Sequence, residues 1–491
     1  MTRRVLRALA AVAVVAVAAC GSERAPEATV STPSRPPAPL APAPSAPPWS
    51  AGDLHALQGA LRTAFGASAL TTSGIAILDA DGRPLFTRRE RTPMTPASTF
   101  KLLVGASALE TLGAGYRFPT TFETTDDPSD GAVHGDLYLV GSGDPTLTRD
   151  DLRGGAGAVA QAGVRIVTGA VVADASIFSG PEVNRAWDPD DLQYDYAAGT
   201  SALSLDQGTV EFRLAPTSVG APAQVDVEPP SDMVRVAGSI ITSYTTEFTI
   251  QRDAARNDFT VDGRIAAGAE QSFWRPIVDQ PRYAAGVART MLRDRGVEID
   301  SGIRVGVAPV APYVLWRHRS KPLQDVVHQM MLESNNHFAE QLLRAIGATR
   351  GEGTEANGAQ VERAILQRDG VPQEGLRILD GSGLAPSDRV MPLTLATLLA
   401  RTAAEPIGHV FVSALPRVGI EGTVRLRRVT DALGRARAKS GHIEDVNALA
   451  GYVQTRRHGR VAFAIMVNDR RADDDAVDEG INRALDVLAR S

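Results

Sequence analysis

A serine and a lysine three positions apart are the first residues in this sequence whose spacing could support chemistry. Ser98 and Lys101 lie in "PASTFKLL", residues 96–103, between a proline and an apolar run. At the start of a helix this spacing puts both side chains on one face, within reach of each other. A serine hydroxyl is a poor nucleophile until a neighbour takes its proton, which a neutral lysine can do. Taken alone, the motif is better explained as a helix cap followed by a solvated charge.

A second segment, "ESNNHFAEQ", supplies a hydroxyl and an amide two positions apart. Ser334 and Asn336 can point into one cleft from a loop between two helical stretches. There Ser334 could pass a proton between Ser98 and a leaving amine, while Asn336 could hold the lysine and a substrate carbonyl. The alternative is a polar loop that caps the following helix, and the segment alone favours it.

A third segment, "RAKSGHIEDVNALAGYV", combines a cation, a hydroxyl and a glycine before strand-like residues. Lys439 and Ser440 offer donors for a terminal carboxylate. Gly441 has no side chain, so substrate could approach closely there, and a strand edge can pair with an extended peptide. The alternative is a positively charged strand end.

The order of these segments, SxxK, then SxN, then KSG, is the signature of penicillin-binding serine enzymes. Four other segments extend the likeness: "LVGSGDPTLT", "SALSLDQGTVE", "DGSGLAPSDRV" and "GIEGTV". Over about residues 50–491 the chain resembles the penicillin-binding D-alanyl-D-alanine carboxypeptidase/endopeptidases with a large insert, the low-molecular-mass class C type. The long separation of Ser98 from Ser334 fits that subfamily, because a β-rich insert fills it.

The resemblance implies a serine DD-peptidase mechanism. Ser98 would attack the carbonyl between two D-alanines at the end of a peptidoglycan stem peptide, with Lys101 as general base. Ser334 would relay the proton to the leaving D-alanine, and Asn336 would position the substrate and Lys101. Water would then cleave the acyl-enzyme. A β-lactam would acylate the same serine, and endopeptidase activity on cross-links is expected as well.

The resemblance also implies a carboxylate clamp and an oxyanion hole. Lys439 and Ser440 would bind the terminal carboxylate, with Lys439 keeping the site positive. The backbone N–H groups of Ser98 and His442, just past Gly441, would form the oxyanion hole. Two departures stand out in "KSGH": a serine replaces the commoner threonine, and His442 replaces a small hydroxyl residue.

Three other polar residues carry weaker signals. His337, like His442, flanks a motif, but neither has a triad partner at a readable spacing, so structural roles are expected. Arg389 could contact substrate or form a salt bridge. Asp144 is expected to be a turn residue within the insert.

Two rival functions remain open. A β-lactamase of the same fold needs fast deacylation, usually through a water-activating carboxylate, and no clear motif for one is present. A non-catalytic wall-binding lipoprotein would not need Ser98 and Lys101. The net charge of -6 gives no support to nucleic-acid binding, and no metal or other cofactor is expected without Cys pairs or an HExxH segment.

The N-terminus predicts export. Residues 1–20 combine three arginines with an apolar run too short for a membrane span, which needs about 20 residues. They end at Cys20, the only cysteine, as in a lipoprotein signal whose cysteine is lipidated; plain secretion is the alternative. Residues 21–49 read as a Pro/Ala-rich tether. We expect a protein anchored to the outer face of the cytoplasmic membrane, or otherwise secreted to the periplasm or wall.

The length of 491 residues predicts more than one domain. Helix and hairpin patterns at both ends indicate an α/β fold, and the resemblance implies a penicillin-binding/β-lactamase-like α/β/α sandwich with an antiparallel sheet. Residues 50–118 and 280–491 are expected to form the catalytic domain. Short strand-like runs between Gly, Pro and Asp predict a β-rich insert of one or two small domains at residues 119–279.

Overall fold

The computed structural model describes residues 47–66, 70–268, 270–310, 313–469 and 473–491. The expected signal peptide, Cys20 and most of the tether lie outside these residues. The described residues all belong to one compact unit, residues 46–491. Within the described residues, no helix combines the length and the apolar character that crossing a membrane requires.

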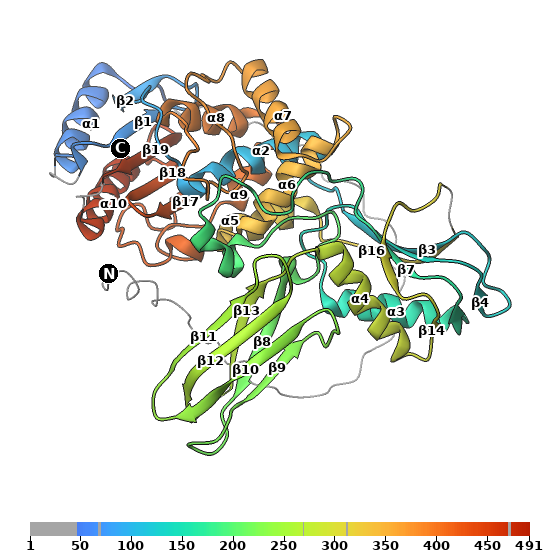
Figure 1. Ribbon diagram of the computed structural model, residues 1–491. Coiled ribbons are helices and arrows are strands. Elements are labelled where there is room, and N and C mark those ends of the chain that lie inside the picture. Colours follow the sequence, from blue (N-terminus) through green and yellow to red (C-terminus); the bar gives the residue numbers. More distant parts are fainter. Residues whose placement is uncertain (1–46, 67–69, 269, 311–312, 470–472) are drawn as a thin grey trace, which may run out of the picture. The chain divides into compact units, whose positions relative to one another are not determined.

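A five-stranded antiparallel sheet joins the two ends of the described chain (Figure 1). Each strand pairs with its neighbour in antiparallel register. In spatial order the strands are β17 (Ala436–Ile443), β18 (Val446–Gln454), β19 (Arg460–Asn468), β1 (Gly74–Leu78) and β2 (Pro84–Arg88). Strand β17 stands at one edge, where residues 416–418 hydrogen-bond to its first residues, Ala436 and Ala438. Among the described residues, no strand pairs with Lys439, Ser440 and Gly441 on this outer side.

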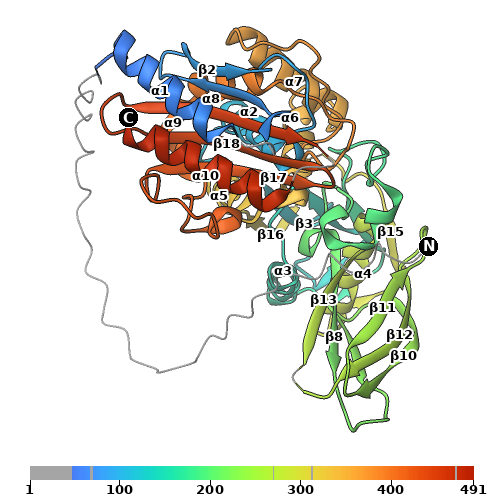
Figure 2. The ribbon, with the colours of Figure 1, turned by 90° about the vertical axis from the view of Figure 1, so that its left-hand side faces the viewer.

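Helices cover both faces of this sheet. On one face, α1 (Ala51–Ala64) and α10 (Asp474–Arg490) lie together (Figure 2). Alternate residues of β19 serve the two faces, as strand geometry requires: Phe463 and Ile465 join the core under α1 and α10, whereas Ala464 joins the core on the other face. The result is a three-layered α/β/α arrangement.

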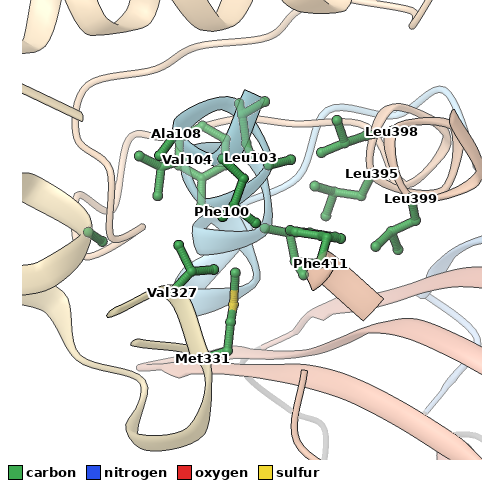
Figure 3. Packing of buried hydrophobic residues seen from close by; sticks show 14 of the residues in the cluster. Phe100, Leu103, Val104, Ala108, Val327, Met331, Leu395, Leu398, Leu399 and Phe411 are labelled. Atoms are coloured by element: carbon green, nitrogen blue, oxygen red, sulfur yellow. The ribbon is translucent and has the colours of Figure 1, made fainter. Parts of the chain in front are cut away.

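The second face carries helices that surround the buried helix α2 (Lys101–Leu112). Figure 3 shows Phe100, Leu103 and Val104 of this region packed among side chains of its neighbours. A Cβ at Gly105 would lie 2.6 Å from the Met331 Cε atom, so glycine lets α5 approach closely. The neighbours are α5 (Leu323–Glu333), α6 (Asn336–Ala348), α7 (Glu355–Arg368), α8 (Pro392–Ala404) and α9 (Gly408–Ala414).

The middle of the chain is rich in short strands. A mixed sheet in the order β15-β7-β5-β3-β16 lies with the short sheet β14-β6-β4 and two helices. These elements are β3 (Pro119–Thr124), β4 (Ala132–Val133), β5 (Leu137–Gly141), α3 (Arg149–Gln161), β6 (Ile166–Val167), β7 (Val171–Asp174), α4 (Gln280–Arg293), β14 (Glu298–Ile299), β15 (Ile303–Val305) and β16 (Tyr313–Arg319).

Two further three-stranded sheets pack against each other, with the Phe212 and Phe259 rings 4.9 Å apart at their contact. One holds β8 (Thr209–Ala215), β9 (Gln224–Glu228) and β13 (Gln271–Pro276), and the other β10 (Arg235–Ser243), β11 (Glu247–Arg252) and β12 (Asp258–Ala266). The β-rich insert is therefore present.

Strand pairing in the insert continues beyond the expected boundary at residue 279. Strand β15 pairs with β7, and β16 pairs with β3, so the hydrogen-bonded sheet runs to Arg319. Local sequence patterns do not reveal such a pairing, because the partners are far apart in the chain. The domain limits themselves stay a prediction.

Candidate active site

Ser98 lies in a short 3-10 turn, residues Ala97–Phe100, that leads directly into α2. The turn begins after Pro96 and makes no side-chain cap hydrogen bond, so the helix-cap interpretation of Ser98 is wrong. Ala97 has a φ of 46°, a left-handed conformation that costs a residue with a Cβ about 1–2 kcal/mol. Surrounding packing must hold this turn in place and, with it, the Ser98 hydroxyl.

The side chain of Lys101 is fully buried behind Ser98. Its Nζ atom lies 2.9 Å from Ser98 Oγ, 2.7 Å from Asn336 Oδ1 and 2.9 Å from the carbonyl oxygen of Ser382. Burial lowers the pKa of Lys101 to about 7, although the nearby carboxyls of Asp380 and Glu340 oppose this shift. A substantial fraction of this amine is therefore neutral near pH 7 and can accept a proton.

The SxN segment connects α5 to α6. Ser334 ends α5 with a φ of 61°, and Asn335 caps α6 by accepting a hydrogen bond from the Phe338 N–H at 3.0 Å. Asn336 is the first residue of α6 and donates through Nδ2 to the Tyr196 carbonyl at 2.8 Å. Asn335 thus caps α6, as the structural interpretation of this loop expected, while the neighbouring Asn336 contacts Lys101. Among the described residues, the Ser334 hydroxyl makes no hydrogen bond to Ser98 or Lys101.

The KSG segment lies on edge strand β17. Lys439 is fully buried, and its Nζ donates to the Ser440 carbonyl at 2.6 Å. Burial, with the positive charge of Lys101 as a second cause, holds the pKa of Lys439 well below its ordinary value. The hydroxyls of Ser440 and Thr423 lie 2.7 Å apart and are hydrogen-bonded. Thr423 was missed from the sequence, although it lies in the quoted segment "GIEGTV".

Glycine is needed at position 441 because the chain itself approaches closely there, and not, as expected, to leave room for substrate. A Cβ there would lie 2.7 Å from the Pro96 carbonyl oxygen and 3.1 Å from the Ser98 backbone nitrogen. The turn that carries Ser98 therefore occupies the space that the sequence suggested for substrate. The same contact brings β17 against the Ser98 N–H.

The other polar residues singled out in the sequence have structural surroundings. His337 is buried, accepts a hydrogen bond from Gln341 Nε2 at 3.2 Å, and has its pKa lowered to about 4 by burial. His442 is exposed. Arg389 donates to Thr95 Oγ1 at 2.8 Å and to backbone carbonyls of its own loop.

Asp144 forms the expected turn. Its Oδ1 accepts from the Thr146 N–H at 2.8 Å, and its Oδ2 lies 3.4 Å from His318 Nε2. No local pattern indicates this pairing, because His318 belongs to β16, far from Asp144 in the chain.

A cleft of about 1010 Å³ opens beside the SxN segment. Ser334 and Asn336 line it from the junction of α5 and α6, and Tyr196, Trp274 and His318 line it from the insert. Residues of the SxN segment and of the insert thus share one concave surface, which can hold a polar, extended ligand next to Ser334.

Comparisons with known proteins agree with this geometry. Residues 57–491 match the D-Ala-D-Ala carboxypeptidase 3 (S13) family. The D-alanyl-D-alanine carboxypeptidase of Actinomadura sp. (strain R39) is 34% identical over 417 residues, covering 81% of this chain and 77% of its own. The D-alanyl-D-alanine carboxypeptidase DacB of Haemophilus influenzae is 26% identical, covering 76% of this chain and 80% of its own.

A solved structure shares the fold. The crystal structure of penicillin binding protein 4 from Haemophilus influenzae superposes with a TM-score of 0.78 and 22% sequence identity, covering 88% of this chain and 99% of that chain.

The fold, together with the contact of Ser98 with the buried Lys101, fits a serine hydrolase of the penicillin-binding class. The chain belongs to the D-Ala-D-Ala carboxypeptidase 3 (S13) family. It is a serine-type D-Ala-D-Ala carboxypeptidase, and the resemblance and fold class predicted from its three motifs are confirmed. The roles of the individual side chains stay predictions, as does lipid attachment at Cys20.

Proposed function

We propose that this enzyme cleaves the terminal D-Ala-D-Ala bond of peptidoglycan stem peptides through an acyl-enzyme at Ser98. The observation that carries the proposal is the 2.9 Å contact between Ser98 Oγ and a buried Lys101 amine whose pKa is lowered to about 7. A serine acquires nucleophilic character when a neutral amine at this distance can take its proton.

Acylation begins when Ser98 Oγ attacks the penultimate D-alanine carbonyl carbon and the hydroxyl proton passes to Lys101 Nζ. The carbonyl electron pair moves onto oxygen, where the N–H groups of Ser98 and His442 stabilise the oxyanion. The electron pair returns, the C–N bond breaks, and the departing amine takes a proton through Ser334. D-alanine leaves, and an ester at Ser98 remains.

Deacylation repeats these steps with water as the nucleophile. Water loses a proton to Lys101 as its oxygen adds to the ester carbonyl, and the C–Oγ bond then breaks. Ser98 recovers its proton, so the enzyme returns to its starting state.

The terminal carboxylate of the substrate is held beside β17. Ser440 and Thr423 offer hydroxyl donors there, and Lys439 lies behind them. We infer that an arriving carboxylate draws a proton onto Lys439, because a nearby negative charge favours the ammonium form. The positive site expected from the sequence would therefore form when substrate binds.

We further propose β-lactam inhibition, endopeptidase activity and action outside the cytoplasm. A solved structure of penicillin binding protein 4 from Haemophilus influenzae is a complex with a β-lactam, which supports acylation of this chain by such compounds. The cleft beside Ser334 offers room for a cross-linked stem. The export signal and tether predicted from residues 1–49 support an extracytoplasmic site of action, with the lipid at Cys20.

One experiment with the full chain tests the activity. Incubation with labelled penicillin and with a diacyl tripeptide ending in D-Ala-D-Ala should give stable labelling and release of D-alanine. Ser98→Ala should lose both. Ser107→Ala is the matched control, because this buried hydroxyl on α2 makes no hydrogen bond among the described residues, and it should keep both. Rapid turnover of penicillin would indicate a β-lactamase, and absence of labelling would contradict both enzyme functions.

A further inference from the structure

One segment of the insert reaches into the catalytic domain and hydrogen-bonds to residues around Lys101. We call residues 184–196 the insert arm. Asn184 Nδ2 donates to the Leu379 carbonyl at 2.8 Å, and the buried Trp187 donates through Nε1 to Asp380 Oδ2 at 2.9 Å. At the other end of the arm, the Tyr196 carbonyl accepts the Asn336 Nδ2 hydrogen bond.

The Tyr196 contact fixes which way the Asn336 amide points. A backbone carbonyl can only accept hydrogen bonds, so the amide nitrogen of Asn336 must face Tyr196. Its amide oxygen must then face Lys101, whose Nζ lies 2.7 Å away. The contact with Tyr196 therefore turns the acceptor oxygen of Asn336, and not its donor nitrogen, toward Lys101.

The Trp187 contact fixes the second acceptor through residues 380–385. Asp380 holds this loop by accepting from the backbone N–H groups of Gly383 and Ala385, each at 2.7 Å, and from Trp187. The carboxyl of Glu340 accepts from the Ser382 N–H at 2.8 Å. These bonds orient the Ser382 peptide so that its carbonyl meets Lys101 Nζ at 2.9 Å.

The same loop supports the turn that carries the nucleophile. A Cβ at Gly383 would lie 2.0 Å from the Ala97 carbonyl oxygen, so this glycine packs directly on the residue before Ser98. A shift of the loop would therefore move both the acceptor of Lys101 and the strained turn at Ala97.

Two fixed acceptors determine where the lone pair of a neutral lysine points. A neutral amine has two N–H bonds and one lone pair. When the N–H bonds are directed to Asn336 Oδ1 and the Ser382 carbonyl, the lone pair is left facing Ser98 Oγ. Neither acceptor can exchange roles with the amine, because each can only accept.

We propose that the insert arm is a positioning element for acylation, which aims the Lys101 lone pair at Ser98 by fixing these two acceptors. Trp187 and Asn184 are its positioning residues. The inference rests on the proposed role of Lys101 as the base, and it gives the insert a part in the reaction besides lining the cleft.

Trp187→Phe in the full chain tests this inference, because it removes the indole N–H and keeps an aromatic ring. Active sites are counted by titration with labelled penicillin, and kcat and KM for the diacyl tripeptide are given per titrated site. We expect kcat to fall about tenfold or more, as for loss of a hydrogen bond to a charged group, with KM changed less than about twofold. Trp49→Phe is the matched control and should keep its kcat, since the Trp49 indole N–H makes no hydrogen bond among the described residues and its ring stacks on His458.

Each outcome has one reading. An unlabelled wild-type chain would contradict the proposed function itself. If the wild type is labelled and Trp187→Phe keeps its kcat per titrated site, the positioning role is overturned. The same holds if Trp187→Phe has fewer titrated sites but an unchanged kcat at each of them. If Trp187→Phe does not fold, Asn184→Ala takes its place, with an expected fall in kcat of about threefold and an unchanged kcat as the contradicting result.

Discussion

Gly441 and Ser98 are in backbone contact: a Cβ on Gly441 would lie 3.1 Å from the Ser98 nitrogen and 2.7 Å from the Pro96 carbonyl oxygen. Strand β17 therefore rests against the turn that carries Ser98. The N–H that is proposed to stabilise the oxyanion is thus in direct contact with the strand that is proposed to hold the carboxylate.

Gly441→Ala should displace this turn. We expect the rate of acylation by penicillin to fall about 10²-fold or more, as when an oxyanion-hole donor is lost, and the free energy of unfolding to fall by about 1–3 kcal/mol from overpacking. Stopped-flow acylation and denaturant unfolding measure the two effects. Gly59→Ala is the control, since nothing lies within 4 Å of its added Cβ in α1, and it should acylate normally. Normal acylation by Gly441→Ala would show that the contact is not needed.

The pH dependence of acylation should follow the proton on Lys101. Only its neutral form is a base, and that form increases as pH rises through its pKa of about 7. The second-order rate constant should therefore rise with pH, show its inflection near pH 7 and level off above it, as kcat/KM reports the free enzyme. Rate measurements with penicillin across this range, in a buffer series of constant ionic strength, check the profile. A rate independent of pH between about 5 and 9 would exclude Lys101 as the titrating base.

Ligand binding should take up a proton at Lys439. Burial and the charge of Lys101 hold the pKa of Lys439 low in the free enzyme, and a substrate carboxylate raises it. Titration calorimetry of the Ser98→Ala chain with a D-Ala-D-Ala peptide, in buffers of different ionisation enthalpy, measures the protons exchanged. We expect net uptake near neutral pH that disappears when Lys439→Met is added. Uptake that persists without Lys439 would assign the proton to another group.

Thr423 should affect substrate binding more than chemistry. Thr423→Val removes the hydroxyl that pairs with Ser440, so KM for the tripeptide should rise about two- to tenfold while kcat changes little. Thr423→Ser keeps the hydroxyl and should restore the wild-type KM. If serine and valine gave the same KM, the hydroxyl would have no part in binding.

The sequence predicted the family, because SxxK, SxN and KSG keep their order and types over a long chain. Lys101 and Asn336 could be paired with Ser98 in advance because one lies on the same helix face and the other is part of a recognisable motif.

What the sequence did not reveal depends on contacts between distant segments. Trp187 and Asp380 are far apart in the chain, and nothing local to either indicates their hydrogen bond. Glu340 reads as an ordinary polar position on a helix, yet it is buried and bonded to the backbone at Ser382. Ser98 suggested a cap because a serine after proline commonly starts a helix, whereas the strained Ala97 turns it toward Lys101.

Lys101 is proposed to take the proton of Ser98, and the acylation rate of Lys101→Met is the closest test of this step. Intact-mass spectrometry of the full chain follows the penicillin adduct with time, and thermal unfolding checks that the variant is folded. We predict a single adduct on the wild type that maps to Ser98, and formation about 10²–10⁴-fold slower in Lys101→Met near neutral pH. An adduct formed at the wild-type rate by a folded Lys101→Met chain would contradict the account.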